Sequence, residues 1–247
     1  MYDRLGQDLL SPIMNVKSLR DEGVTLHLLL VGQSERDPVP DVPAIYFCRP
    51  TEENLRRIAK DMEDGLYGSY YFNFISPISR QRLEDLATAS IRASAVQQVQ
   101  KLFDQYVNFI CLENELFVLR HQESSSLSYH ALNTASVTDA GMEEMLSQIV
   151  DSLFAVCVTL GTIPIIRCPK GNAAEAVASR LDKKLRENLR DTRNSLFIND
   201  GMQAGQYSFY RPVLVLLDRQ FDMATPLHHT WTYQAMAHDV LKYSLNR

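Results

Sequence analysis

Four short apolar segments, separated by residues with helical periodicity, dominate the first half of the chain. Each has the length and the β-branched or aromatic content of a strand: 24–31 (VTLHLLLV), 44–48 (AIYFC), 70–75 (YYFNFI) and 107–112 (VNFICL). Strands that alternate with helices are typical of a parallel sheet with helices on its faces. The pattern therefore predicts an α/β fold, in which an open parallel sheet flanked by helices forms the N-terminal domain.

Two hydroxyl side chains mark the starts of the intervening helices. Thr51 can cap a helix whose apolar residues recur on one face. Ser79 can cap a longer helix over residues 80–103, which we expect to break near residues 90–94.

A second α/β block follows a change of composition. The segment 122–128 (QESSSLS) is typical of a linker, so the predicted domains are 1–122 and 123–247. The second block has two predicted helices, 142–160 and 173–193, and two predicted strands, 163–167 and 213–217.

The strand count indicates missing partners. Two strands rarely form a stable sheet, so we expect the second block to be the first half of a domain. Residues 1–4 resemble the tail of a strand and its polar exit, so we expect the first strand to be truncated. We therefore expect this chain to be part of a longer protein that continues beyond both of its ends.

Charge and composition exclude several function classes. The net charge of −5 does not indicate a nucleic-acid binder, and the most basic segment, residues 180–193, has the leucine spacing of an amphipathic helix with a solvated face. The four cysteines form no CxxC pair and no secretory leader precedes them, which predicts buried free thiols in the cytoplasm. No apolar run approaches the roughly 18 to 20 residues of a transmembrane helix, so we expect no transmembrane segment.

Two carboxylates follow the last predicted strand, which we expect to be buried on both faces. Asp218 and Asp222 lie where an α/β sheet usually binds ligands, so they could hold a metal or act as acid and base. Their spacing differs from that of aspartyl-nucleophile phosphatases, and Arg219 between them suggests an internal salt bridge. We favour a structural junction of Asp218, Arg219 and Asp222, and the alternative is a metal-dependent α/β hydrolase or phosphatase.

Other candidate sites are weaker. His228, His229 and His238 do not have the spacing of a helical metal pair. The segment 170–172 (KGN) could present amides to a phosphate but matches no phosphate-binding motif. We therefore expect no catalytic residue, no metal and no cofactor.

The segment after Ser79 carries more apolar positions than one helix face can bury. These positions are Leu83, Leu86, Ala87, Ile91, Val96, Val99 and Leu102. Either all of them face the core, or some form an exposed groove for a partner.

Long stretches of the chain resemble a known family. The segment 216–241 (LLDRQFDMATPLHHTWTYQAMAHDVL) resembles the strand-to-helix signature of the Sec/Munc (SM) proteins, which regulate SNARE-mediated membrane fusion. The segments 2–30, 41–55 and 163–191 are similar to the Sly-type branch, which acts between the endoplasmic reticulum (ER) and the Golgi. The resemblance extends over nearly the whole chain.

The resemblance implies a non-enzymatic SNARE-binding protein. Family members are longer and form an arch of three domains, so residues 1–122 correspond to the first domain and residues 123–247 to half of the second. The implied partners are an ER–Golgi syntaxin (a Qa-SNARE) and its SNARE complex. The resemblance also implies a cytoplasmic protein that associates peripherally with ER and Golgi membranes by binding those SNAREs.

The resemblance also implies site residues. In Sly-type members, a pocket on the outer face of the first domain takes an aromatic side chain from the N-terminal peptide of a syntaxin. The matching positions are Leu83, Leu86, Ala87, Val99 and Leu102. Asp3 and Arg4 match the region that faces the central cavity, and we expect Trp231 and Tyr233 to pack the helix after the structural junction.

Overall fold

A computed structural model describes residues 1–30, 36–119, 127–191, 196–197 and 211–241. The chain divides into two compact units, Met1–Val107 and Asn108–Arg247. This division precedes the predicted domain boundary between residues 122 and 123, which lies outside the described residues. The predicted α/β class is confirmed, since helices alternate with parallel strands in both units.

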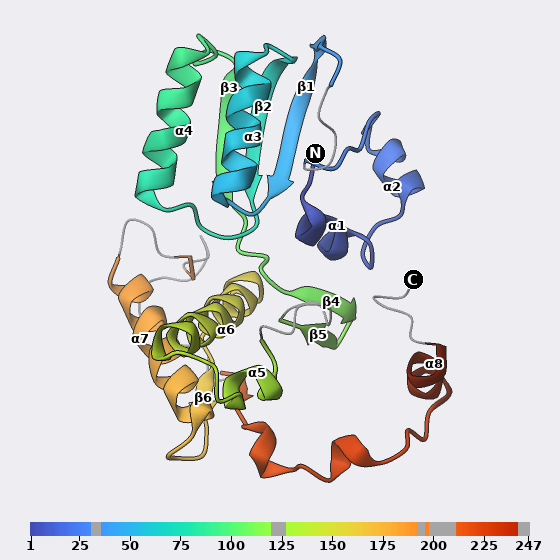
Figure 1. Cartoon of the computed structure of the whole chain (residues 1–247), viewed down its shortest axis with the longest axis vertical. Coiled ribbons are helices and arrows are strands. Elements are labelled where there is room, and N and C mark those ends of the chain that lie inside the picture. Colours follow the sequence, from blue (N-terminus) through green and yellow to red (C-terminus); the bar gives the residue numbers. More distant parts are fainter. Residues whose placement is uncertain (31–35, 120–126, 192–195, 198–210, 242–247) are drawn as a thin grey trace. The chain divides into compact units, whose positions relative to one another are not determined.

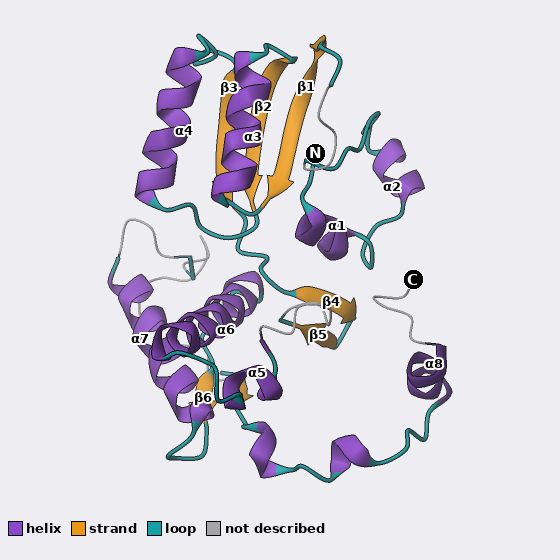
Figure 2. Cartoon of the chain, in the orientation of Figure 1, coloured by secondary structure: helices purple, strands orange, loops and turns teal. Residues whose placement is uncertain are grey.

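The first unit is built on a parallel sheet. Its strands are β1 (Val39–Cys48), β2 (Tyr67–Phe74) and β3 (Val99–Asp104), in the order β1-β2-β3. Tyr46 lies opposite Phe72, and Phe72 lies opposite Leu102, so the three strands share one register. Figure 2 shows α3 and α4 together on one side of this sheet.

The two helices begin where the sequence predicts. The α3 helix (Glu52–Glu63) starts after Thr51, whose side chain accepts a hydrogen bond from the Asn54 amide. The α4 helix (Arg80–Arg92) starts after Ser79, whose side chain accepts from the Arg82 amide. Both caps satisfy amides that the first helical turn leaves without a partner.

The helix predicted over residues 80–103 is shorter than expected. It ends at Arg92, and Ser94 adopts a left-handed φ of 54°, which confirms the predicted break. Residues 99–104 then form β3 and not a helix. The spacing of Val96, Val99 and Leu102 fits a helical face, and pairing with β2 overrides that local pattern.

The predicted strand over residues 24–31 is wrong in its described part. Leu29 forms one isolated bridge with Tyr2, and Tyr2 also bridges Phe47 of β1. The Leu30 amide donates to the Tyr2 carbonyl at 2.8 Å, and the Phe47 amide donates to the Met1 carbonyl at 2.7 Å. Residues 1–2 thus sit beside β1 as the expected strand tail, and α1 (Arg4–Leu10) and α2 (Val16–Asp21) follow.

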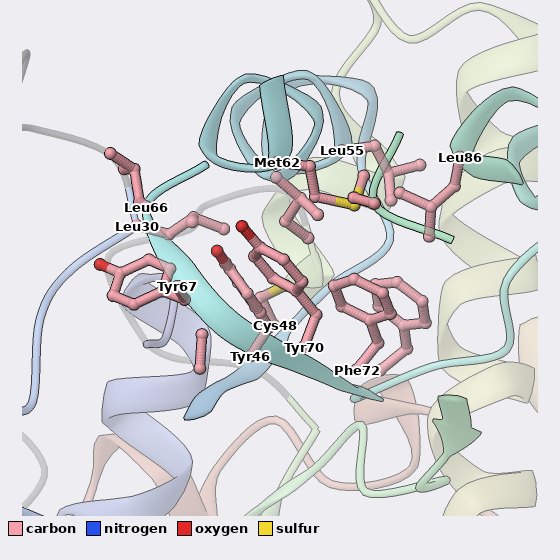
Figure 3. Packing of buried hydrophobic residues seen from close by; sticks show 14 residues of the cluster. Leu30, Tyr46, Cys48, Leu55, Met62, Leu66, Tyr67, Tyr70, Phe72 and Leu86 are labelled. Atoms are coloured by element: carbon pink, nitrogen blue, oxygen red, sulfur yellow. The ribbon is translucent and has the colours of Figure 1, made fainter. Parts of the chain in front are cut away.

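An aromatic layer under α3 and α4 forms the core of the first unit. Tyr46 of β1 contacts Phe72 of β2 with ring centroids 5.5 Å apart, and Tyr70 and Phe74 extend the row along β2. Leu55 and Met62 from α3 and Leu86 from α4 cover these rings (Figure 3). The alternation of buried aromatic and half-buried residues along β2 reflects the period of two in a strand.

The second unit combines a hairpin with a helical pair. Its hairpin strands, β4 (Ile110–Glu113) and β5 (Leu116–Val118), are antiparallel. A short helix, α5 (Tyr129–Asn133), precedes the long α6 (Asp139–Thr159) and α7 (Ala173–Arg190). Salt bridges from Arg180 to Glu143 and from Lys184 to Asp151 join the last two helices.

The C-terminal part of the second unit differs from the prediction. The β6 (Ile165–Arg167) and β7 (Val213–Val215) strands form a parallel pair. Val213 and Val215 are each 58% exposed, so β7 is not buried on both faces. Two short 3-10 helices, η2 (Arg219–Phe221) and η3 (Thr225–Leu227), lead to α8 (Tyr233–Leu241).

Two aromatic side chains at the start of α8 also contradict their predicted role: Trp231 lies two residues before Tyr233, the first residue of the helix. Trp231 is 96% exposed and Tyr233 is 88% exposed, so neither packs against the helix. A strand pair presents two faces, and no other described strand extends the β6–β7 pair. The apolar residues of this region therefore lack the covering layer that the sequence pattern assumes.

Candidate functional site

The α4 helix has a buried face and two contrasting flanks. Leu86 is 6% exposed and belongs to the core of the first unit, where Figure 3 shows it beside the aromatic layer. On one flank, the Arg82 guanidinium donates to the Pro50 carbonyl at 2.8 Å, at the start of α3. This flank therefore faces α3.

The opposite flank of α4 is apolar and open. Leu83, Ala87 and Ile91 follow one another at four-residue intervals, so they lie in one row along the helix. Leu83 is 41% exposed, Ile91 is 67% exposed and Ala87 is also exposed. We call these three residues the α4 apolar row, and it lies on the side of Leu86 away from Arg82.

Two residues of β3 pack against the core that α4 covers. Val99 and Leu102 are half-buried and pack against the core cluster that contains Leu86. β3 is also the outermost strand of the sheet, on the side of α4 (Figure 1). Of the five predicted pocket residues, Leu86 is therefore in the core, Val99 and Leu102 are half-buried against that core, and Leu83 and Ala87 are exposed.

The exposures rule out the first of the two alternatives left by the sequence, that all these residues face the core. Leu86 faces the core, whereas the α4 apolar row faces solvent. Ile91 extends the exposed row by one turn, and its four-residue spacing from Ala87 already indicates that position in the sequence. Exposed apolar side chains in one row are a feature of surfaces that contact other molecules.

Asp3 and Arg4, the predicted cavity residues, differ in exposure. Asp3 is buried, and its carboxylate accepts from the Gly6 amide at 2.8 Å, from the Arg49 Nε at 3.0 Å and from Asn54 Nδ2 at 3.1 Å. It caps α1 and ties that helix to the start of α3. Arg4 is exposed, so it is the member of the pair that a partner can reach.

Asp218, Arg219 and Asp222 form the turn that follows β7. The Asp218 carboxylate caps η2 by accepting from the Gln220 amide at 3.0 Å. Asp222 accepts from the Thr225 hydroxyl and from the Ala224 and Thr225 amides at 3.0 Å. The pKa of Asp222 is lowered, and the hydrogen bonds from Thr225 are the largest cause. The nearby positive charge of Arg219 is the smallest cause of the same shift.

The geometry of these carboxylates suits a turn and not a metal centre. Within the described residues, no group of three or more His, Cys, Asp or Glu side chains could hold a metal ion. The predicted salt bridge of Arg219 with Asp218 or Asp222 is not among the ion pairs of the described residues. Their oxygens instead satisfy backbone amides of the two 3-10 helices.

The remaining weak candidates have structural roles or no site around them. The Gly171 amide donates to the Glu175 carboxylate at 2.6 Å, so a side chain of α7 already occupies the expected phosphate position. Cys48 and Cys157 are buried free thiols, whereas Cys111 and Cys168 are half-buried. Burial raises the pKa of Cys48 to about 12 and that of Cys157 to about 11, which keeps both protonated near neutral pH.

No helix in the described ranges combines the length and the apolar character that crossing a membrane requires.

Comparison with known proteins places the chain in a family. The model of the Sec1 family matches residues 1–247. The chain belongs to the Sec1 family. The resemblance of its motifs to the SM proteins is thereby confirmed.

Named relatives of this Sec1-family chain include proteins of animals. The human "Sec1 family domain-containing protein 1" is 62% identical over the whole chain, and the Drosophila melanogaster "Protein sly1 homolog" is 57% identical. These names agree with the predicted Sly-type branch. The chain spans 38% of the length of each of these relatives.

Solved structures show the same fold. A crystal structure of Sly1p in complex with an N-terminal peptide of Sed5p aligns with a TM-score of 0.81 and 36% identity, over 94% of this Sec1-family chain and 36% of that protein. The SM protein Vps45 in complex with the Qa-SNARE Tlg2 aligns with a TM-score of 0.78 over 96% of the chain and 39% of that protein. At 24% identity, this second likeness supports the fold alone.

Proposed function

We propose that this chain is the SNARE-binding part of an SM protein that regulates vesicle docking and fusion between ER and Golgi. In this proposal it captures the N-terminal peptide of a Qa-SNARE of the syntaxin type. The observation that carries the proposal is the 36% identity, over 94% of the chain, with Sly1p bound to an N-terminal peptide of Sed5p. The family membership and the Sly-type relatives support it.

The geometry of the first unit supports the position of the peptide site. Leu83 and Ala87 of the α4 apolar row are exposed, and Val99 and Leu102 pack against the same core as Leu86. A bound apolar side chain would contact Leu83 and Ala87 directly. Leu86 acts from below, by holding α4 on the sheet.

We further propose that the protein acts by binding and not by catalysis. The Asp218 and Asp222 carboxylates serve the turn after β7, and nothing in the family comparison supports a hydrolase. Peripheral association with ER and Golgi membranes through the SNARE partner completes the proposal, together with a cavity-facing role for Arg4. Residues 1–122 and 123–247 would then be the first SM domain and half of the second.

Substituting the exposed member of the site tests the proposal. In calorimetry with a synthetic N-terminal peptide of Sed5p, Leu83→Asp is expected to weaken binding by about tenfold or more, because a charge replaces an apolar contact surface. Leu86→Lys is a poorer test, since Leu86 is buried and its loss would also unfold α4. The matched control is Ile13→Asp, which changes an apolar side chain that is 64% exposed outside the site.

Two results would contradict the proposal. The peptide site is wrong if Leu83→Asp and Ile13→Asp bind the peptide as tightly as the parent chain. The whole function is wrong if the parent chain shows no binding while its circular dichroism is that of a folded α/β protein.

A further inference from the structure

A serine or threonine directly before proline occurs at three places in the chain, and the surroundings differ. The dipeptides are Ser11-Pro12, Ser76-Pro77 and Thr225-Pro226. Such a dipeptide is the minimal recognition sequence of proline-directed protein kinases. Ser76 is half-buried, and the exposed Thr225 already donates its hydroxyl proton to the Asp222 carboxylate. Ser11 is exposed, and Ile13, two residues after it, is 64% exposed.

Ser11 ends α1 in a conformation that its own sequence disfavours. It precedes Pro12, and a proline ring crowds the helical conformation of the residue before it. Ser11 nevertheless has helical angles, with φ −56° and ψ −40°. Two hydrogen bonds to the Gln7 carbonyl hold it there, one from its amide at 2.9 Å and one from its hydroxyl at 2.7 Å. The hydroxyl therefore helps to keep the last turn of α1 closed.

A phosphate on Ser11 would act against this turn in three ways. The esterified oxygen carries no proton, so it could not donate to the Gln7 carbonyl. The phosphate would add negative charge at the negative end of the helix dipole, and α1 has no basic residue in its last turn. Asp8, three residues before Ser11, places a carboxylate on the same side of the helix. Each effect favours the extended conformation that a residue before proline prefers.

We infer that Ser11 is a phosphorylation site for a proline-directed protein kinase, and that the phosphate unwinds the last turn of α1. The kinase transfers the γ-phosphoryl group of ATP to the Ser11 Oγ. The bond between the γ-phosphorus and the ADP oxygen breaks as the Oγ–phosphorus bond forms, and the hydroxyl proton passes to the catalytic aspartate of the kinase. Residues 11–15 connect α1 to α2 and pair with no described strand, so they can enter a kinase active site while the sheet stays intact.

Phosphate incorporation tests the site. The full chain is incubated with ATP and a cyclin-dependent kinase, and in parallel with a mitogen-activated protein kinase, and mass spectrometry locates the phosphate. The parent chain should gain a phosphate on Ser11. Ser11→Ala removes the acceptor and Pro12→Ala removes the kinase recognition, so each should lower the incorporation at least about tenfold. Ser76→Ala is the matched control and should leave the incorporation unchanged, because Ser76 is half-buried.

Amide exchange by NMR tests the effect on α1. The Ser11 and Met14 amides donate to carbonyls of the last turn, at 2.9 Å and 2.8 Å. Both amides should exchange at least about tenfold faster in the phosphorylated chain. The Leu83 amide, which donates to the carbonyl of the residue before α4, is the internal control and should not change. Unphosphorylated Ser11→Ala loses only the hydroxyl hydrogen bond, so its exchange should lie between that of the parent and that of the phosphorylated chain.

Two results would overturn the inference. If neither kinase places a phosphate on Ser11, including the case in which only Ser76 or Thr225 is modified, the site is wrong. If Ser11 carries the phosphate but the Ser11 and Met14 amides exchange as in the parent chain, α1 does not respond to it and the switch is wrong.

Discussion

Asp3 shows how one buried carboxylate organises the N-terminal part of the first unit. Its two oxygens accept from the Gly6 amide, the Arg49 guanidinium and the Asn54 amide group, which belong to three segments. The neighbouring Arg4 is exposed and has no comparable role. Two adjacent polar residues that look equivalent in sequence thus differ in function because only one is enclosed.

Replacing Asp3 tests this structural role. Asp3→Ala should destabilise the first unit by about 2–4 kcal/mol, since it removes a helix cap worth about 1 kcal/mol and leaves buried donors unsatisfied at about 1–3 kcal/mol. Arg4→Ala, the matched control, should stay within about 0.5 kcal/mol. Hydrogen exchange of the β1–β3 amides reports the stability of this unit alone. Equal values for the two variants would show that Asp3 is not a structural hub.

At the scale of elements, a buried ion pair between Arg36 and Asp61 links α3 to residues 29–30. Arg36 Nη1 lies 2.6 Å from Asp61 Oδ2 of α3, with side chains that are 2% and 0% exposed. Arg36 Nη2 also donates to the Leu30 carbonyl at 2.6 Å, and Tyr46 donates its hydroxyl proton to the Asp61 carboxylate at 3.0 Å. The segment that contains Leu29 and Leu30 forms only one β-bridge, to Tyr2. Hydrogen bonds from the Arg36 side chain therefore take the place of the backbone hydrogen bonds of a regular strand.

Removing one partner of this pair should be costly. Arg36→Met is expected to destabilise the first unit by about 3–5 kcal/mol, because it leaves the buried Asp61 carboxylate with too few partners. The double variant Arg36→Met, Asp61→Leu should recover only part of that loss. It avoids burying an unpaired charge, but it also removes the acceptor of the buried Tyr46 hydroxyl. The shift in guanidinium unfolding of the first unit measures both. A double variant no more stable than Arg36→Met would assign the effect to shape and not to charge.

At the scale of the whole molecule, the two units differ in how well they bury apolar residues. The first unit encloses its aromatic layer between β1–β3 and the helices α3 and α4. The second unit buries one face of α6 and α7 but leaves apolar residues of β7, η2, η3 and α8 exposed. Large exposed apolar patches are features of surfaces that bind other protein elements, and the exposed residues of this unit are the ones that such an element could cover.

The single tryptophan reports this difference directly. Trp231 is 96% exposed, so the native emission maximum should match that of tryptophan in water and should shift little on unfolding in guanidinium. Acrylamide should quench the native and unfolded chains to a similar extent. A blue-shifted native spectrum that reverts on dilution would instead show that copies of the chain cover this surface.

Helix starts, the parallel sheet and the family could all be predicted from the sequence. Thr51 and Ser79 cap helices through their own neighbours, and an apolar run such as residues 70–75 has the composition of a buried strand wherever it lies. These features depend on contacts within a few residues, and the family signature depends on the order of residues alone. The candidate pocket could be predicted as a set of positions through the resemblance.

Only the tertiary structure decided which of those positions are exposed. Residues 99–104 have helical spacing but form β3, because pairing with β2 stabilises them more than local propensity. Leu83 and Leu86 are both leucines of one helix, and packing on the sheet buries one and leaves the other open. Val213 and Trp231 are apolar, which predicts burial, yet both are exposed. Burial needs a covering layer from other elements, and a residue's own type cannot specify that layer.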